Sequence, residues 1–227
     1  AGTGSVSIAA NTALYLDSAS VLAAFSGVLS LSGGASLSLP ADDNPLGGAS
    51  LRLLGGTVFG SASRVTNDVF LAAGTTSAWA GSAAAVTLSG GLSGSGSLAA
   101  TAPGFILAGD ASAFSGSVSF SGDGSGFSGP ASGSARAAYR VDSPSFTVDV
   151  ASASSPLRLG ALTVTNPLAV VSCAQASTPL ELGALGEACS LAGPFSGASF
   201  SLVKTGSAAL TLGAALDRKS TRLNSSH

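Results

Sequence analysis

The sequence predicts an all-β protein built as a β-solenoid, on three observations. Large apolar residues alternate with small polar ones in many short segments. Clusters of Gly, Ser, Asn and Asp separate these segments, and the tripeptide Phe-Ser-Gly recurs along the chain. The alternation is the period of a strand with one buried face. Repeated units that cannot bury their apolar faces alone do so by stacking along an axis, which favours the solenoid.

Six segments carry the strand pattern most clearly. In each of them, every second residue is large and apolar, and a turn-forming cluster follows. In chain order they are VTLSG (86–90), SVSFSG (117–122), FTVDV (146–150), LTVTN (162–166), FSLVKTG (200–206) and LTLG (210–213).

The recurring tripeptide gives the repeat its marker residues. Phe-Ser-Gly occurs at 25–27, 114–116, 127–129 and 195–197, and three of the copies run directly into a strand pattern, as FSGVLSL, FSGSVSF and FSGASFSL. A glycine after an aromatic residue and a small one lets the backbone turn a corner. We therefore expect stacked copies to place the phenylalanines of these three in similar interior environments as the repeat core: Phe25, Phe114 and Phe195.

Composition excludes several classes of protein. Hydrophobic residues make up 45% of the 227, which is enough for a core, and charged residues only 9%. The formal net charge is −2, so the basic footprint of a nucleic-acid-binding protein is absent. No apolar run reaches the roughly 18 residues of a membrane span. The chain contains no methionine, so we expect the natural protein to begin before Ala1.

The last eleven residues, DRKSTRLNSSH (217–227), differ from the rest. They concentrate charge in an otherwise charge-poor chain, and they contain its only histidine, His227. All eleven positions agree with a one-frame translation of a common sequencing adapter. We therefore treat 217–227 as an adapter-derived tail and 1–216 as a fragment of the natural protein, truncated at both ends. The alternative is a natural basic tail. Without these residues, the remaining part has no histidine.

Two cysteines form the one candidate for a covalent cross-link. Cys173 and Cys189 enclose the short loop 174–188. In an exported protein such a pair suggests a disulfide, which would stabilise the fold by about 3 kcal/mol on the loop-closure estimate. Two unbonded thiols are the alternative. With two cysteines and no histidine before the tail, the sequence predicts no zinc site.

The segment SGDGSGFSG (121–129) superficially resembles two functional motifs. One is the Gly-Asp-Ser-Gly around a serine-protease nucleophile, but a glycine separates Asp123 from Ser125 and no histidine can act as the base. The other is the calcium-binding nonapeptide of β-rolls, which needs tandem copies, and only one is present. A loop between turns of the solenoid is the favoured interpretation.

Three further features have a structural and a functional interpretation. ADDNPLGG (41–48) offers paired carboxylates, Asp42 and Asp43, but Asn-Pro before Gly-Gly is turn chemistry. ARAAYRVDSP (135–144) is dense in charge and is interpreted as a solvated loop, with a contact loop for a glycan or a partner as the alternative. The single Trp79 is interpreted as a core or turn residue instead of a sugar platform. We predict no catalytic, cofactor-binding or metal-binding residue.

Two stretches resemble the passenger-associated repeat of bacterial autotransporters. The first is VTLSGGLSGSGSLAATAPGFILAGDASAFSGSVSFSG (86–122), and the second is SFSLVKTGSAALTLGAAL (199–216), whose VKTGSAALTLG is similar to the Lys-Thr-Gly strand pair of the family. NDVFLAAGTTSAWAGSAAAVTLSG (67–90) resembles the lead-in to the repeat. The first copy has ATAPG (100–104) where the family has its Lys-Thr-Gly.

The resemblance implies a right-handed parallel β-helix within a passenger that is secreted by, or displayed on, a Gram-negative bacterium. It implies a non-enzymatic stalk or adhesin-like scaffold whose ligand is a host-surface protein or a glycan. Contact with the outer membrane would be made only through a C-terminal translocator barrel that this fragment does not include. Two alternatives remain open: a β-helical polysaccharide lyase, which would gather acidic and basic residues in one groove, and a non-bacterial surface repeat protein that shares only the low-complexity β pattern.

Overall fold

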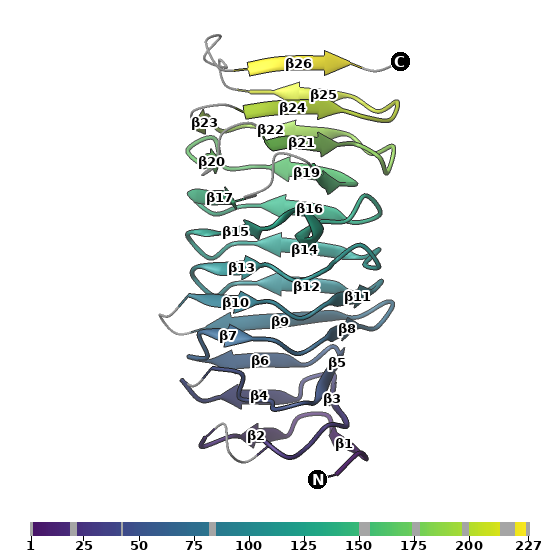
Figure 1. Cartoon of the computed structure of the whole chain (residues 1–227), viewed down its shortest axis with the longest axis vertical. Helices are drawn as coiled ribbons and strands as arrows, with labels where there is room; N and C mark the ends of the chain where they lie inside the picture. Colours follow the sequence, from purple (N-terminus) through teal and green to yellow (C-terminus); the bar gives the residue numbers. More distant parts are fainter. Residues whose placement is uncertain are drawn as a thin grey trace.

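The computed structural model describes residues 2–18, 22–41, 43–81, 85–149, 155–173, 178–196, 200–213 and 221–225. They form a parallel β-solenoid of about nine turns, with the two ends of the chain at opposite ends of the coil (Figure 1). Every ladder between the named strands is parallel, and the strands form four sheets. The all-β solenoid predicted from the sequence is therefore confirmed.

One face of the coil is a continuous ten-stranded sheet. Each of its strands is contributed by a different turn of the chain. In stacking order the strands are β2 (Ala13–Tyr15), β4 (Ser36–Leu39), β6 (Thr57–Gly60), β9 (Thr76–Gly81), β12 (Ser97–Ala100), β14 (Ser117–Phe120), β16 (Ala138–Val141), β19 (Ala161–Val164), β22 (Cys189–Leu191) and β25 (Leu210–Leu212).

A second face is a seven-stranded sheet that begins at the third turn. Its strands follow those of the ten-stranded sheet along the chain. They are β7 (Arg64–Val65), β10 (Val86–Leu88), β13 (Phe105–Leu107), β15 (Ser125–Ser128), β17 (Ser145–Asp149), β20 (Val170–Cys173) and β23 (Phe195–Ser196).

The third face changes from one sheet to another along the axis. The short 3₁₀ helix η2 (Pro130–Ser132) lies between the two sheets and contacts the first strand of the upper one. The lower sheet consists of β1 (Ser5–Ile8), β3 (Val28–Ser32), β5 (Ser50–Leu54), β8 (Val69–Leu71) and β11 (Leu92–Gly94), and the upper one of β18 (Leu157–Leu159), β21 (Thr178–Leu182), β24 (Phe200–Lys204) and β26 (Thr221–Ser225).

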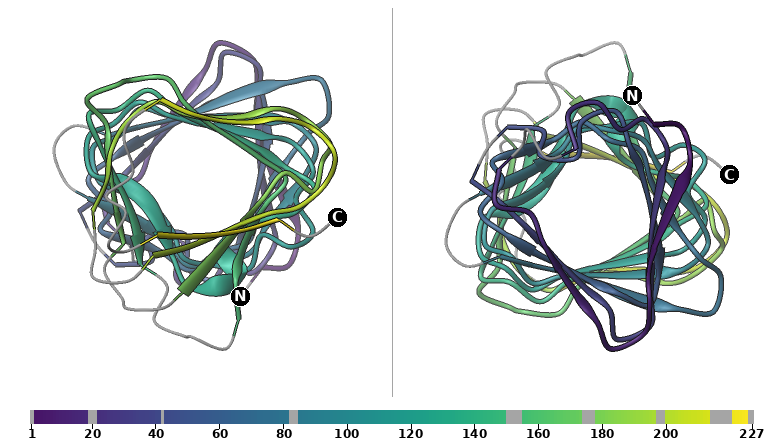
Figure 2. Two further views of the ribbon diagram at one scale, coloured as in Figure 1. Left: turned by 90° about the horizontal axis from the view of Figure 1, so that it is seen from above. Right: turned by 90° about the horizontal axis from the view of Figure 1, so that it is seen from below.

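The number of residues in a turn of the coil determines which residues of adjacent turns lie side by side. Ser117 pairs with Ala138 on the next turn, and Ala138 pairs with Ala161 on the turn after that. Because parallel strands of adjacent turns lie about 4.8 Å apart, residues one turn apart in sequence are direct neighbours. The views along the axis show the turns superimposed around it (Figure 2).

Inward-facing side chains stack in columns that run along the axis. In the ten-stranded sheet, Trp79, Ala100 and Phe120 occupy one interior column on successive turns, and all three are buried. The small Ala100 leaves room for the two large rings on either side of it, as close packing requires. Trp79 is thus a core residue, which confirms the structural interpretation of its sequence.

An aromatic cluster lies in the middle of the coil, among buried aliphatic side chains. Each ring lies with its centroid 5.1 to 6.4 Å from that of a neighbour, in tilted or edge-to-face geometry. Such pairs contribute about 0.5–1.5 kcal/mol each beyond their buried area. The rings are those of Trp79, Phe105, Phe120, Phe127, Tyr139 and Phe146.

The six strand segments predicted from the alternation all contain strands, which are β10, β14, β17, β19, β24 and β25. The interpretation of 135–144 as a solvated loop was wrong, because β16 runs through it and Tyr139 is buried. The phenol of Tyr139 accepts a hydrogen bond from the backbone N–H of Ser134 at 2.9 Å, so a polar tip is satisfied inside the core.

The tail of the chain forms a last strand. Residues Thr221–Ser225 pair in parallel with β24, from Phe200 to Lys204. An exposed strand edge pairs with any extended segment that reaches it, so this pairing is compatible with either origin of 217–227. The division of the chain at Leu216 therefore stays a prediction.

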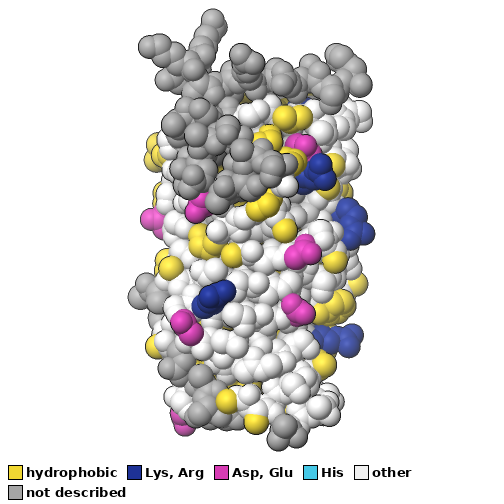
Figure 3. Space-filling model, viewed as in Figure 1, with side chains coloured by type: hydrophobic (Ala, Val, Ile, Leu, Met, Phe, Trp, Pro, Cys, Tyr) yellow, Lys and Arg dark blue, Asp and Glu magenta, His cyan; other side chains and the backbone are white. Residues whose placement is uncertain are grey.

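The outer surface carries few charges. In Figure 3 the charged side chains are few and lie singly or in pairs of opposite charge over a mostly uncharged surface. Two ion pairs join described residues, Arg140 with Asp142 and Arg158 with Glu181, both at 2.8 Å. Hydrogen bonds to Arg140 hold the pKa of Asp142 below its usual value. No helix among the described residues is long and apolar enough to cross a membrane.

Candidate functional site

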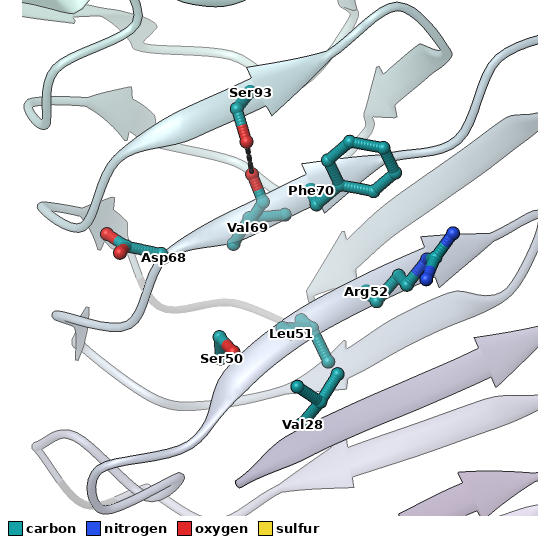
Figure 4. A pocket seen from close by; sticks show the side chains of 8 residues that line it. All are labelled: Val28, Ser50, Leu51, Arg52, Asp68, Val69, Phe70 and Ser93. Atoms are coloured by element: carbon teal, nitrogen blue, oxygen red, sulfur yellow. Dashed lines mark hydrogen bonds between the residues drawn. The ribbon is translucent and has the colours of Figure 1, made fainter. Parts of the chain in front are cut away.

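A hollow of about 380 Å³ on the lower sheet of the third face is the best candidate for a binding site. We call it the Arg52–Phe70 hollow. Its lining comes from β3, β5, β8 and β11 and the residue before β8, and these strands belong to neighbouring turns of the coil (Figure 4). The lining residues are Val28, Ser50, Leu51, Arg52, Asp68, Val69, Phe70 and Ser93.

Strand alternation places the key side chains on the outside. In β5, Arg52 lies between the buried Leu51 and Leu53, and in β8, Phe70 lies between two buried residues. Since successive side chains of a strand point to opposite faces, burial of the neighbours forces Arg52 and Phe70 outward. Phe70 remains 39% exposed.

Arg52 and Phe70 are direct register partners on adjacent turns. The guanidinium carbon of Arg52 lies 5.2 Å from the centroid of the Phe70 ring, which is cation–π geometry. The guanidinium group of Arg52 donates no hydrogen bond within the described part of the protein. The other described cations do: Arg64 to Ser89, Arg136 to Ser112, Arg140 to Asp142, Arg158 to Glu181 and Lys204 to Gly206. The ring thus holds a guanidinium whose donors have no acceptor among the described residues.

Asp68 lies at the opposite end of the hollow from Arg52 and Phe70 (Figure 4). Its backbone is fixed by the buried Asn67, whose side-chain amide donates to the carbonyls of Gly47 at 2.9 Å and Ala49 at 2.6 Å. One carboxylate oxygen of Asp68 accepts a hydrogen bond from the backbone N–H of Gly91 at 2.8 Å. Asp68 and Arg52 form no ion pair with each other, so the hollow keeps an acceptor at one end and a donor at the other.

A second hollow, of about 640 Å³, lies where the third face changes from one sheet to the other. Arg136 and Arg158 line it, together with several serines. Both arginines already have acceptors: Arg136 donates to the carbonyl of Ser112 at 3.1 Å, and Arg158 to Glu181 at 2.8 Å. Their guanidinium groups are therefore less available to a ligand than that of Arg52.

The three phenylalanines predicted as the repeat core occupy different places around the coil. Phe114 is fully buried and bridges to Gly94 at the end of the lower sheet of the third face. Phe25 is half-buried and bridges to Gly2, before that sheet begins. Phe195 lies in β23 of the seven-stranded sheet, and its side chain is outside the described part.

The glycines of two Phe-Ser-Gly copies nevertheless share one local role. A Cβ on Gly116 would lie 1.9 Å from the carbonyl oxygen of Gly96 and 2.8 Å from the ring of Phe114. A Cβ on Gly27 would likewise lie 1.8 Å from the carbonyl oxygen of the glycine one turn earlier, and 2.7 Å from the ring of Phe25. Glycine is needed because the ring and the preceding turn approach the backbone together.

The cysteine pair stays a prediction. Cys173 ends β20 in the seven-stranded sheet, and Cys189 begins β22 in the ten-stranded sheet. The sulfur of Cys189 is buried and lies 3.9 Å from the carbonyl oxygen of Glu187. The side chain of Cys173 lies outside the described part, so the disulfide is not decided.

The segment 121–129 is not a simple loop, because β15 occupies Ser125–Ser128. Ser125 is fully buried, and its hydroxyl donates to the carbonyl of Gly122 at 2.7 Å, which is a structural role. Asp123 accepts a hydrogen bond from the hydroxyl of Ser145 on the next turn. The serine is therefore inaccessible to a substrate.

The segment 41–48 forms the turn predicted for it. Asn44 adopts a left-handed φ of 54°, and its side-chain amide donates to the carbonyl of Gly47 at 3.1 Å. Asp43 accepts a hydrogen bond from the hydroxyl of Ser63, while Asp42 lies outside the described residues. The carboxylate of Asp43 is engaged with the neighbouring turn.

Other described carboxylates are also engaged locally. Among the described residues, no group of three or more His, Cys, Asp or Glu side chains is placed to hold a metal ion. Asp110 accepts a hydrogen bond from the backbone N–H of Ser112 at 2.8 Å, which lowers its pKa. Asp43 and Asp123 follow strands of the ten-stranded sheet on turns far apart, and Asp110 follows a strand of the seven-stranded sheet.

Sequence reasoning did not single out Arg52, Asp68 or Phe70. A signal was present, because the alternation in SLRLL and VFL puts an arginine and a phenylalanine at outward positions of a wall otherwise rich in Ser, Thr and Ala. Their adjacency depends on the turn that leads from Leu51 to Val69, which is shorter than the turns on either side of it. The sequence alone does not reveal that register.

Comparison with protein-family models, with curated proteins and with solved structures gives no match to this chain.

Proposed function

We propose that the chain is part of an autotransporter passenger, a surface-displayed or secreted β-helix that serves as a non-enzymatic, adhesin-like scaffold. The fold that such a role requires is present: a parallel coil that continues over about nine turns. A stack of this kind forms a stiff rod whose stability is roughly a sum over its turns, and its loops and faces are free for binding.

The observation that carries the proposal is the geometry of the Lys-Thr-Gly corner. Lys204 ends β24, and its ammonium group donates to the carbonyls of Thr205 and, at 2.9 Å, Gly206. The hydroxyl of Thr205 donates to the carbonyl of Leu182 on the preceding turn at 3.0 Å. Gly206 adopts a φ of +69°, which favours glycine. Each residue of the motif thus has its own task in a corner of the solenoid.

The corner also corrects the alignment of the two repeat copies. The sequence alignment places ATAPG (100–104) opposite Lys-Thr-Gly. In the structure this segment lies after β12, at the corner between β12 and β13, whereas Lys-Thr-Gly lies before β25. The corner before β12 is the counterpart of the Lys-Thr-Gly corner before β25, since Leu98 and Leu210 fall in one interior column. The two copies therefore enter the same sheet in the same way, which supports a common repeat.

The experiment that tests the proposal is a long sequencing read across the genomic locus. We expect the reading frame to depart from 217–227 after Leu216 and to continue through further turns into a translocator barrel. A genomic frame that encodes DRKSTRLNSSH and then stops would contradict both the adapter origin and the passenger assignment.

A polysaccharide lyase is the alternative, and a direct assay separates it from a scaffold. Incubation of the chain with acidic polysaccharides should release no unsaturated sugars and no new reducing ends. Turnover that exceeds a heat-denatured control would replace the scaffold proposal with an enzyme. The local hydrogen bonds of five described carboxylates support the scaffold: those of Asp43, Asp68, Asp110, Asp123 and Glu181.

A further inference from the structure

We propose that the Arg52–Phe70 hollow binds one neutral pyranose unit of a glycan. The inference rests on the proposed adhesive function for its setting, because it names the ligand class that the scaffold would recognise. The residues that line the hollow by themselves indicate the chemical class of the ligand.

The two ends of the hollow have complementary hydrogen-bonding capacity. The guanidinium of Arg52 can only donate, and the ionised carboxylate of Asp68 can only accept. The two groups lie too far apart to form an ion pair and are not joined by any other described side chain. A ligand that bridges them must accept at one end and donate at the other. A sugar hydroxyl does both, and a pyranose ring carries such groups on opposite edges.

The wall of the hollow also offers apolar surface. Phe70 is 39% exposed and Val28 is 38% exposed, and both line the hollow together with the small Ser50. The C–H face of a pyranose is apolar, so it can cover a ring edge and a branched side chain while its hydroxyls reach the polar ends. Pockets for small molecules typically combine apolar lining with a few placed polar groups.

Size and charge narrow the choice of ligand. A volume of about 380 Å³ lies at the lower end of the range for small-molecule sites, which suits a single sugar unit. Arg52 and Asp68 are the only charged residues in the lining, and they cancel. An anionic ligand would be attracted by the guanidinium of Arg52 but repelled by the carboxylate of Asp68. A neutral sugar therefore fits the hollow better than an acidic one.

The test is saturation-transfer NMR of the whole chain with the methyl glycosides of glucose, galactose and mannose, and with methyl glucuronoside as the acidic probe. We expect saturation transfer to the ring protons of at least one neutral glycoside, with a dissociation constant in the millimolar range that suits a shallow single-sugar site. Phe70→Ala and Asp68→Asn should each weaken binding by at least about tenfold. Arg52→Lys keeps the charge but loses the planar donor fork, and should weaken binding as well.

Phe59→Ala provides the matched control. Phe59 is an outward phenylalanine on the ten-stranded sheet, 44% exposed, and lies outside the hollow. It should leave the affinity unchanged. Melting curves of all variants check folding, which these exposed positions should preserve.

Three results would overturn the inference. One is the lack of saturation transfer with every neutral glycoside, and the second is transfer to the glucuronoside alone, which would indicate an anion site. The third is an equal loss in Phe59→Ala, which would indicate unspecific contact with exposed rings. None of these results bears on the passenger assignment, which the genomic read decides, so the two proposals fail separately.

Discussion

Replacing Phe120 by alanine should cost about 3–5 kcal/mol of unfolding free energy. The side chain is fully buried in the middle of the coil, and truncation of such a residue costs this much through lost burial and the cavity left behind. The loss should lie near the upper end of the range, because the ring centroid lies 5.2 Å from that of Phe146 and 5.5 Å from that of Phe127. Ala100, the preceding residue in the same column, is too small to fill the cavity.

The assay is urea unfolding followed by circular dichroism, combined with hydrogen exchange to locate the weakened turns, because a stacked array can unfold in sections. As the urea concentration increases, the rate of amide hydrogen exchange should rise first in β12 to β17, around the cavity. Phe59→Ala, in the same sheet but facing outward, is the matched control and should cost less than about 1 kcal/mol. A loss below about 1 kcal/mol for Phe120→Ala would refute the interior column as described.

Three further predictions concern the backbone, a buried phenol and the cysteines. Gly116→Ala should destabilise the protein by about 1–3 kcal/mol or more, since its Cβ has no space, whereas Gly4→Ala, with nothing within 4 Å of the added carbon, should be nearly neutral in the same urea assay. Burial raises the pKa of Tyr139, so its contribution to stability is present below the unfolded pKa of about 10 and is lost as the pH rises above that value. Melting temperatures across that range should therefore fall less in Tyr139→Phe than in the parent, and parallel curves would contradict the burial. Alkylation of the denatured protein with and without prior reduction, read by intact mass, should label Cys173 and Cys189 only after reduction; labelling of both without reductant would rule out the disulfide.

The strand segments could be predicted because their information is local. Period-two alternation in a segment such as 117–122 specifies a strand with one buried face whatever its neighbours are, and β14 is found there. The prediction for 135–144 was wrong because it too used only local information, in this case the high density of charge. Its charges at Arg140 and Asp142 occupy outward or corner positions of a turn, while Tyr139 beside them points into the core.

The candidate site could not be predicted, because it depends on register between turns. Arg52 and Phe70 belong to consecutive turns, and nothing in either strand alone fixes which residue of the next turn each will meet. The Phe-Ser-Gly copies show the same limit. Their glycines have one local role at 27 and 116, yet the corners they form lie at different positions around the coil.

The class of fold, the positions of the clearest strands and the need for glycine at tight corners follow from local sequence, because hydrophobic alternation and backbone sterics act over a few residues. Which side chains meet depends on how the turns stack. Turns differ in length, since the one from Leu51 to Val69 is shorter than the one from Ala138 to Ala161, and each difference shifts where the next turn begins. The stacking of inward columns then sets the register, since a slip of one residue would turn the inward side chains of a strand outward, and this register brings Arg52, Phe70 and Asp68 to one hollow.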